Sequence, residues 1–247
     1  MVKTQAVVLR RRDLKERDKL LTLYTQEHGK LTVRAIGAKK IESKLGGHVE
    51  PFMRTEVCLV TSKTIDILAG AQVVEAYPQL RSSISGTHAA QYLMEVVDQL
   101  TPDGQQEPSV YELLCSGLDI LNQQSRVNFL TVQATVLKIL GRLGFEPELD
   151  KCVHCALPTV SGDYLFNVSA GGVTHSRCGG DITWAAPQVQ FETIKSLRFS
   201  LRSPLDAMAS LRLSPIIWEQ LNTCIDQLVL THSRKPIRSR LFLAQAN

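Results

Sequence analysis

The chain of 247 residues has no long apolar run and no segment with the layout of a secretory signal. A helix that spans a membrane needs about 18 or more consecutive apolar residues, and a signal peptide needs a shorter apolar core followed by small residues. Because both patterns are missing, the sequence predicts a cytoplasmic protein without membrane contact. Hydrophobic residues make up 44% of the chain and charged residues 21%, which is typical of a globular fold and excludes a disordered or fibrous class.

Common catalytic signatures are missing as well. The sequence contains no GxxxxGK[ST] phosphate loop, no strand-linked GxGxxG and no GxSxG elbow, so neither ATP use nor serine hydrolysis is predicted. The HExxH motif of metalloproteases and the zinc deaminase motif are also absent. The sequence therefore predicts a binding protein rather than an enzyme.

Six cysteines are too few and too scattered for a disulfide framework in a cytoplasmic chain. Cys58, Cys115 and Cys224 stand alone in alternating or helical apolar patterns. Free cysteine in such a position behaves as a small buried hydrophobe, so we assign these three no chemistry.

Short alternating or β-branched runs dominate the first 76 residues, and short turns separate them. The predicted strands are Gln5–Leu9, Leu20–Thr25, Lys30–Ile36, Thr55–Val60, Ile65–Ala69 and Gln72–Ala76. Five or six strands without a long helix between them favour a small β-barrel of the OB type. We therefore expect an α+β chain whose first domain, residues 1–79, is a nucleic-acid-binding OB-fold.

After Leu80 the apolar residues recur with a period of about 3.6, which predicts helices. The predicted helices are His88–Gln99, Val110–Asn122, Val127–Leu143, Gln190–Leu197, Asp206–Arg212 and Ile216–Leu230. Gly144 is placed to end the third of them. Residues 80–247 are thus predicted to form an α-helical domain, and a small ribbon interrupts it at about residues 150–182.

This interruption carries two pairs of metal-ligand residues. Cys152 and Cys155 form the first pair, and His175 and Cys178 form the second after nineteen residues. Each turn of this kind brings two ligands to one side of an ion, and thiolates with a neutral imidazole favour zinc. The intervening residues include a candidate strand over 163–167 and a turn at Gly171 and Gly172. Since four protein ligands would close the coordination sphere, the zinc is predicted to be structural.

Three alternatives to this ligand set remain open. His175 could be a solvated loop residue, the fourth ligand could be His154 or Asp181, or this ribbon could hold no metal. His154 lies between two ligands, where its side chain is expected to point away from the ion. Asp181 has suitable spacing after Cys178, but a carboxylate is a harder ligand than zinc prefers beside thiolates.

Positive charge is concentrated in the N-terminal third. Residues 1–80 carry 14 Lys and Arg against 9 Asp and Glu, whereas residues 81–247 carry 14 against 15. An excess of cations on one side of a barrel can bind phosphates with release of counterions. The candidate DNA-binding residues are Arg10, Arg11, Arg12, Lys15, Arg17, Lys19, Lys30, Arg34, Lys39, Lys40 and Lys44. A solvated charged surface is the alternative, because Asp13, Glu16 and Asp18 partly offset the first group.

Aromatic residues are scarce in the same region, where only Tyr24, Phe52 and Tyr77 occur. Stacking of successive bases needs aromatic platforms, so binding through the phosphate backbone with little sequence specificity is expected. A second candidate surface is the pair Lys138 and Arg142, one helical turn apart, which could bind an acidic partner peptide; a solvated helix face is the alternative.

Several segments resemble the bacterial RecO family. The N-terminal run AVVLRRRDLKERDKLLTLYTQEHGKLTVRAIGAKK and the following SKLGGHVEPF resemble the start of that family. The helix LKILGRLGFEPELDKCVHC and the run FNVSAGGVTHSRC are similar to the two halves of its zinc module, and IRSRLFL is similar to its C-terminal segment. The resemblance covers residues from about 5 to 243.

This resemblance implies an N-terminal OB-fold and a helical domain with a zinc ribbon. It implies binding of single- and double-stranded DNA, annealing of complementary strands, and, with RecR, loading of RecA onto DNA coated with single-stranded-DNA-binding protein. Such a recombination mediator would be nucleoid-associated. Zinc ligands carry over to Cys152, Cys155 and Cys178, and the main departure is His175, at a position where many members have a fourth cysteine. The alternative class is a protein-interaction scaffold whose basic face binds an acidic peptide.

Overall fold

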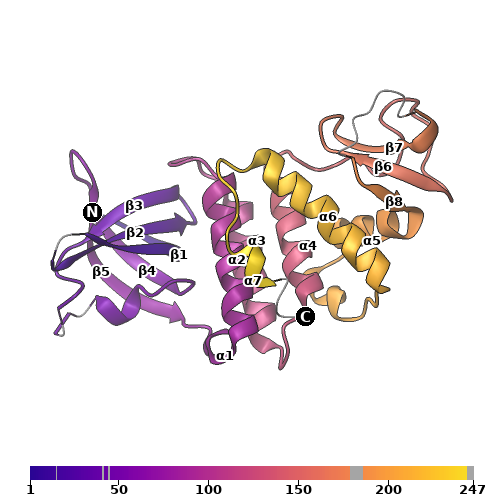
Figure 1. The fold of residues 1–247 in the computed structure, drawn as a ribbon. Coiled ribbons are helices and arrows are strands. Elements are labelled where there is room, and N and C mark those ends of the chain that lie inside the picture. The colour runs from indigo at the N-terminus through magenta and orange to yellow at the C-terminus, as the bar shows by residue number, and fades with distance from the viewer. Residues whose placement is uncertain (15, 41, 44, 179–185, 244–247) are drawn as a thin grey trace. The chain divides into compact units, whose positions relative to one another are not determined.

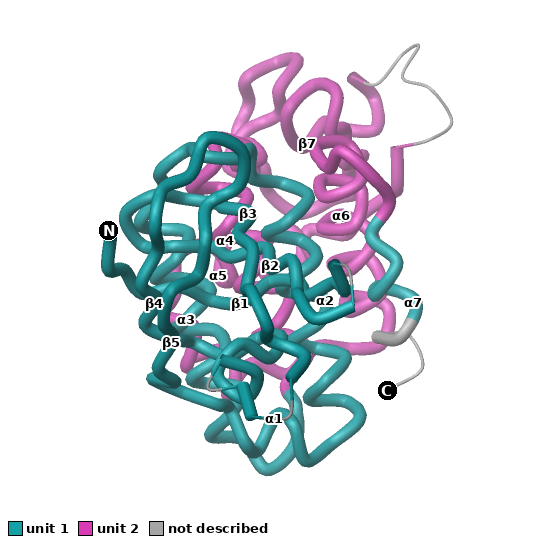
Figure 2. The backbone as a smooth tube through the Cα atoms, turned by 90° about the vertical axis from the view of Figure 1, so that its left-hand side faces the viewer, with its two compact units in different colours: residues 1–127, 237–247 teal, residues 128–236 magenta. Residues whose placement is uncertain are grey.

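The computed structural model describes residues 1–14, 16–40, 42–43, 45–178 and 186–243. For residues 242 and 243 it describes the backbone only. The chain forms two compact units (Figure 2). The first contains residues 1–127 and 237–247, and the second contains residues 128–236. The first unit is thus built from both ends of the chain.

A closed five-stranded barrel begins the first unit. Its strands are β1 (Val2–Leu14), β2 (Asp18–Thr25), β3 (Gly29–Ala35), β4 (Arg54–Val60) and β5 (Asp66–Glu75), in the order β1-β2-β3-β5-β4 (Figure 1). Neighbouring strands are antiparallel except β3 and β5, which pair in parallel over two residues. A short 3₁₀ helix, η1 (Gly46–His48), lies between β3 and β4. This architecture confirms the predicted OB-like barrel.

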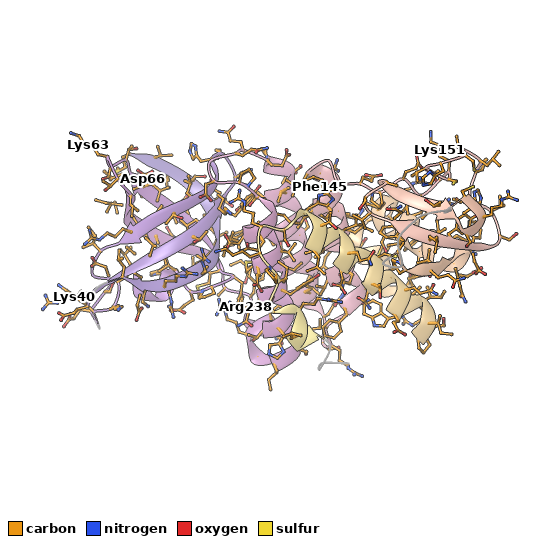
Figure 3. The ribbon with its side chains drawn as sticks, turned by 45° about the horizontal axis from the view of Figure 1, so that its top comes forward. Lys40, Lys63, Asp66, Phe145, Lys151 and Arg238 are labelled. Atoms are coloured by element: carbon orange, nitrogen blue, oxygen red, sulfur yellow. The ribbon has the colours of Figure 1, made fainter. Side chains whose placement is uncertain are left out.

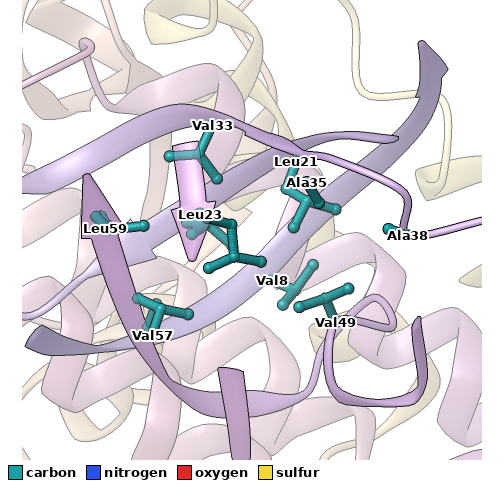
Figure 4. Close-up of a cluster of buried hydrophobic side chains, with 11 residues drawn as sticks. Val8, Leu21, Leu23, Val33, Ala35, Ala38, Val49, Val57 and Leu59 are labelled. Atoms are coloured by element: carbon teal, nitrogen blue, oxygen red, sulfur yellow. The ribbon is translucent and has the colours of Figure 1, made fainter. Parts of the chain in front are cut away.

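Alternating residues of the strands fill the barrel. Val8, Leu21, Leu23, Val33 and Val57 are fully buried in this cluster of eleven residues (Figure 4). The alternation follows from the two-residue period of a strand, which directs every second side chain inward. The alternate residues face away from this interior; they include Leu20 and Thr22 of β2 and Thr32 and Arg34 of β3.

Two strand predictions need correction. β5 is one strand, although two were predicted on either side of Gly70. Gly70 pairs with Cys58 and Leu68 pairs with Leu59, so Ala69 is an extra residue that forms a bulge in β5 while the pairing with β4 continues. β1 also extends well beyond Leu9, because a second irregularity between Val8 and Arg10 lets its charged half pair with β2.

Helices complete the first unit. They are α1 (Pro78–Ser82), α2 (Ile84–Leu100), α3 (Pro108–Gln123) and, from the C-terminal end, α7 (Arg240–Leu243). Ser83 caps α2 by accepting a hydrogen bond from the Gly86 amide, and α3 begins at a proline, where no amide donor is lost. Buried apolar residues of α2 and α3 confirm the predicted helical stripes. The short α1 and α7 were not predicted.

The second unit contains the helices α4 (Phe129–Arg142), α5 (Phe191–Arg202) and α6 (Pro215–His232). Gly144, with φ of 86°, follows the end of α4 as predicted. The helix predicted over 206–212 is wrong. A 3₁₀ helix, η3 (Leu205–Ala209), forms instead, and it stacks the buried Leu205 and Met208 three residues apart on one face.

Between α4 and α5 lies a small three-stranded sheet in the order β7-β6-β8. Its strands are β6 (Asp163–Asn167), β7 (Gly172–His175) and β8 (Gln188–Gln190), and the 3₁₀ helix η2 (Ser176–Cys178) follows β7. The strand predicted over 163–167 is confirmed, and Gly171, with φ of 84°, makes the predicted turn. We call residues 148–178 with β8 the metal module.

None of the helices that the structure describes is long and apolar enough to cross a membrane. The predicted domain boundary between residues 79 and 80 stays a prediction. The division at residue 127 reflects how densely the segments contact one another, and it does not test where one domain ends and the next begins.

Candidate metal centre and nucleic-acid interface

The four predicted metal ligands come together. One ligand atom each from Cys152, Cys155, His175 and Cys178 lies within 4.8 Å of all the others. Cys152 is buried, Cys155 is exposed, and His175 and Cys178 are half-buried. A group of three thiols and one imidazole at this spacing could hold a metal ion.

The imidazole presents its Nδ1 atom to the sulfur atoms. This nitrogen lies 3.4 Å from the Cys155 Sγ and 4.0 Å from the Cys178 Sγ. In a tetrahedral zinc site with ordinary bond lengths, a sulfur and a nitrogen ligand are separated by about 3.6 Å. The donor set and its spacing therefore fit a tetrahedral metal ion bound through Nδ1, with Nε2 left to carry the ring proton.

Tight backbone turns position the first pair of ligands. The amide of Cys152 donates to the Leu157 carbonyl over 2.9 Å, and the amide of Ala156 donates to the Cys152 carbonyl over 2.9 Å. Ala156 adopts a positive φ of 58° to close this turn. The turn holds both sulfur atoms on one side of the chain, which is what a CxxC motif provides to a metal.

The hairpin of β6 and β7 positions His175. Tyr164 pairs with His175 across the strands, and their ring centroids lie 5.1 Å apart. The Tyr164 hydroxyl donates to the Val160 carbonyl and accepts from the Val160 amide, each over 2.8 Å. Tyr164 thus packs against a metal ligand while its hydroxyl holds the preceding loop. Sequence reasoning missed this residue, because only the register of the hairpin reveals it.

A close backbone approach explains Gly172. The amide of the next residue, Val173, donates a hydrogen bond to the Glu148 carbonyl oxygen over 3.0 Å. A Cβ atom at Gly172 would lie only 2.2 Å from that same oxygen. Only glycine fits here. This contact joins β7 to the segment that leads into Cys152, so it brings the two ligand pairs together.

The thiols of the cluster differ in acidity. Burial tends to raise the pKa of Cys152, but backbone amides of Cys155, His175 and His154 point at its sulfur and lower the pKa to about 6. Desolvation and the neighbouring thiols Cys155 and Cys152 raise the pKa of Cys178. The Cys152 sulfur is therefore favoured as a thiolate. A cation at the centre of the cluster would offset the repulsion between negative charges on the three sulfur atoms.

The alternatives for the fourth ligand fare differently. His154 is exposed and is not part of the cluster that the described residues form. Asp181 lies outside the described residues. The geometry thus favours His175 over His154.

Charged side chains tie the metal module to α5 within the second unit. Arg198 donates to the Leu149 carbonyl over 2.6 Å, donates to the Thr159 hydroxyl and pairs with the Asp150 carboxylate at 3.1 Å. Arg202 also pairs with Asp150, at 2.5 Å. These contacts attach both sides of the CxxC turn to one helix, as expected of a module that braces the helical part.

Several of the predicted DNA-binding residues are already engaged in ion pairs. Arg11 pairs with Glu50, Lys39 pairs with Asp13 at 3.0 Å, and Arg34 donates twice to Asp18, at 2.9 and 2.5 Å. These pairs keep part of the basic surface neutral. The sequence had suggested such compensation for Asp13 and Asp18 only as an alternative.

Lys30 occupies a buried position and not a surface one. Its side chain is 4% exposed, and its Nζ atom contacts the Asp98 carbonyl at 2.5 Å, the Asp98 carboxylate at 3.3 Å and Asp103 at 3.4 Å. Arg10 reaches the same Asp98 carboxylate at 3.5 Å. Lys30 therefore links β3 to α2 and does not present its charge to a phosphate. Asp98, a charged residue inside the apolar stripe of α2, was the signal in the sequence for this link.

The remaining described residues among the predicted DNA contacts have no ion pair with any described residue. They are Arg12, Arg17, Lys19 and Lys40, and all except the half-buried Lys19 are exposed. Figure 3 shows Lys40 at one end of the barrel. Lys15 and Lys44 lie outside the described residues.

Cross-strand register places the arginines of the barrel on a common outer face. Arg12 pairs with Leu20, which pairs with Arg34, and Arg10 pairs with Thr22 in the adjacent outward row. Residues that pair across strands share a face of the sheet. Arg10 and Arg12 of β1 and Arg34 of β3 therefore lie on the same outer face, in two neighbouring rows that cross β2 at Leu20 and Thr22.

Lys138 and Arg142 of α4 have different environments. Lys138 donates to the Leu201 carbonyl at the C-terminal end of α5 over 2.5 Å, and burial followed by the charge of Arg142 lowers the pKa of Lys138. Arg142 is exposed in the last turn of α4. Lys138 thus caps a helix inside the unit, whereas Arg142 faces solvent.

Comparison with protein families and with individual proteins gives a consistent result. The family model described as recombination protein O N terminal matches residues 1–77, and the model described as recombination protein O C terminal matches residues 81–241. Together they cover both units.

Proteins named DNA repair protein RecO are similar to the chain over nearly its full length. The protein of Pelotomaculum thermopropionicum is 32% identical over 98% of this chain and 93% of its own length. That of Geobacter sulfurreducens is 31% identical over 99% and 98%, and that of Desulforudis audaxviator is 32% identical over 97% and 95%. These names describe DNA repair and no catalytic activity, and with the two domain matches they show that the chain belongs to the recombination protein O family.

Proposed function

We propose that the chain is a recombination mediator in DNA repair that binds single- and double-stranded DNA and promotes annealing of complementary strands. With RecR it would help to load RecA onto DNA coated with single-stranded-DNA-binding protein. The family supports a role in recombinational repair. The observation that carries the DNA-binding part is the outer face of the barrel and its adjoining β1–β2 turn, where Arg12 and Arg17 are exposed without an ion pair to a described residue.

The physical basis is neutralisation of phosphate repulsion. Each phosphate contact releases bound counterions, so affinity falls with salt in proportion to the number of contacts. Cations on the outer face of β1, β2 and β3 suit this role, because strands of an OB-like barrel present a continuous surface to a nucleic-acid backbone. The proposed contacts are Arg12 on this face, Arg17 in the turn between β1 and β2, Lys19 near the start of β2 and Lys40 after β3, joined by Arg10 and Arg34 where DNA competes for their partners. Lys30 is left out because it is buried.

The proposed metal is zinc, in a structural role. Three thiolates and an imidazole suit zinc, and four protein ligands would leave no open position for a substrate. The ion would fasten the two halves of the metal module, whose contacts to α5 brace the second unit. When bound, zinc supplies no chemistry other than this cross-link.

For partners, we propose that exposed Arg142 contributes to a site for an acidic peptide on the second unit. Lys138 would act there by capping α5 and so fixing the end of that helix.

A DNA titration tests the central proposal. We expect the protein to bind single-stranded DNA at low salt with a marked salt slope, and reversal of two exposed charges, Arg12→Glu with Arg17→Glu, to reduce that slope by about 2 for all sequences alike. The matched control is Arg126→Glu with Arg212→Glu, two exposed arginines outside the barrel. Absence of binding at low salt would overturn the DNA-binding function, and equal loss in both variants would show that another surface binds.

A further inference from the structure

The C-terminal segment lies on the first unit as a short strap, residues 237–240, that bends at Arg238 and Ser239 and leads into α7. Residues 237–240 alternate between the interior and solvent: Ile237 and Ser239 are 7% and 6% exposed, whereas Arg238 and Arg240 are exposed. The buried pair anchors the segment, and the alternation directs both arginines outward. Figure 3 labels Arg238 beside α7. In the sequence these residues belong to the run IRSRLFL, which by itself shows no attachment point.

One carboxylate holds the strap on α2. Glu95 Oε1 accepts a hydrogen bond from the Arg238 amide over 3.0 Å, and Oε2 accepts from the Ser239 amide over 2.8 Å and from the Ser239 hydroxyl over 2.5 Å. Hydrogen bonds to an ionised acceptor are about twice as strong as neutral ones. These bonds use the backbone of Arg238, so its guanidinium group stays directed to solvent.

The attachment point lies next to the barrel's basic face. Glu95 and Asp98 are three residues apart on α2, so they are neighbours on one side of the helix. Asp98 binds Arg10 of the outer arginine rows and the buried Lys30. The strap and the outer face of the barrel are therefore held one helical turn apart on the same helix.

We propose that the strap is a second nucleic-acid contact, in which Arg238 extends the phosphate-binding face of the barrel across α2. The ligand is the phosphate backbone of the same DNA strand, and this inference rests on the proposed DNA-binding function. Glu95 and Asp98 lie between the two surfaces, and both carboxylates accept hydrogen bonds or ion pairs from groups of the protein. They therefore do not prevent one DNA strand from contacting both surfaces. Glu95 acts as a positioning residue that fixes where Arg238 meets the strand.

Two substitutions test the contact itself. Arg238→Glu changes only an exposed side chain, so the fold is retained, and we expect single-stranded DNA to bind about three- to tenfold more weakly with a salt slope smaller by about 1. Arg126→Glu makes the same charge change on an exposed arginine of the same unit and serves as the matched control. If Arg238→Glu binds like Arg126→Glu while Arg12→Glu with Arg17→Glu loses affinity, the strap inference is wrong and the proposed function stands.

A third substitution tests the role of Glu95 in holding the strap. Glu95→Ala removes a negative charge, which would by itself strengthen DNA binding, but it also removes all three hydrogen bonds that hold the strap. We expect weaker binding, together with faster trypsin cleavage after Arg238 and Arg240. Glu112→Ala, which removes an exposed carboxylate from α3, is the matched control and should leave both unchanged. Tighter DNA binding by Glu95→Ala, or unchanged cleavage of the strap, would overturn the role assigned to Glu95.

Discussion

The barrel and the metal module keep their shapes by different means. The barrel buries a cluster of eleven hydrophobic residues between five paired strands, whereas the module has three short strands and gathers four ligand residues at one point. A core of that size stabilises itself through the apolar surface it removes from water. A small ribbon cannot bury enough surface, and a metal cross-link substitutes for it. Removing the ion should thus affect one region and spare the other.

Metal removal is the largest expected effect. Structural zinc sites contribute on the order of 10 kcal/mol to folding, so a strong chelator or Cys152→Ser should unfold the metal module while the barrel stays folded. Hydrogen exchange read by mass spectrometry should show loss of protection over residues 152–175 and none over β2. Elemental analysis of the purified protein should find one zinc per chain.

Two outcomes would contradict this comparison. Unchanged protection of the metal module after chelation would show that its own packing suffices, and equal loss in the barrel would show that the two regions fold as one. The control variant is Cys58→Ser. It changes a half-buried cysteine of β4 outside the ligand cluster and should retain the metal.

A buried charge distinguishes the barrel from an ordinary apolar core. Lys30→Met should destabilise the first unit by about 2–4 kcal/mol, because it leaves the buried Asp98 with weaker compensation. Urea denaturation followed by a barrel signal measures the change, and metal content should not alter. Lys40→Met, at an exposed lysine, is the matched control, with an expected cost below about 0.5 kcal/mol. Equal stability of the two variants would show that the Lys30 contacts are dispensable.

The two regions also differ from the buried lysine in how well the sequence predicts them. The metal ligands are predictable because each pair lies within four residues, so spacing alone constrains their geometry. The barrel follows from alternation, which is equally local. Lys30 was predicted at the surface and is buried, since its position depends on a pairing with Asp98, 68 residues later in the chain, and local spacing does not reveal which cation an isolated helix carboxylate binds.

Non-local pairing accounts for the other differences. Gly70 resembled a strand break, but a bulge at the neighbouring Ala69 lets β5 keep its pairing with β4 on both sides. The strap at Ile237–Arg240 was not recognised because its acceptor, Glu95, lies more than a hundred residues earlier. Tyr164 gains its role from the register of one hairpin. Sequence patterns thus predicted elements that local spacing determines and missed contacts that tertiary pairing creates.

A pair of tyrosine hydroxyls provides the smallest and most selective test of the comparison. Tyr164→Phe removes two hydrogen bonds to Val160, whose backbone groups regain water, so the cost should be about 1 kcal/mol. The looser loop should release zinc to a chromophoric chelator severalfold faster. Tyr24→Phe removes a single long hydrogen bond to Glu107 in the first unit and should leave the release rate unchanged. If both variants release zinc at the parent rate, Tyr164 contributes only its ring to the site, and the cross-link alone determines how firmly the metal module holds its ion.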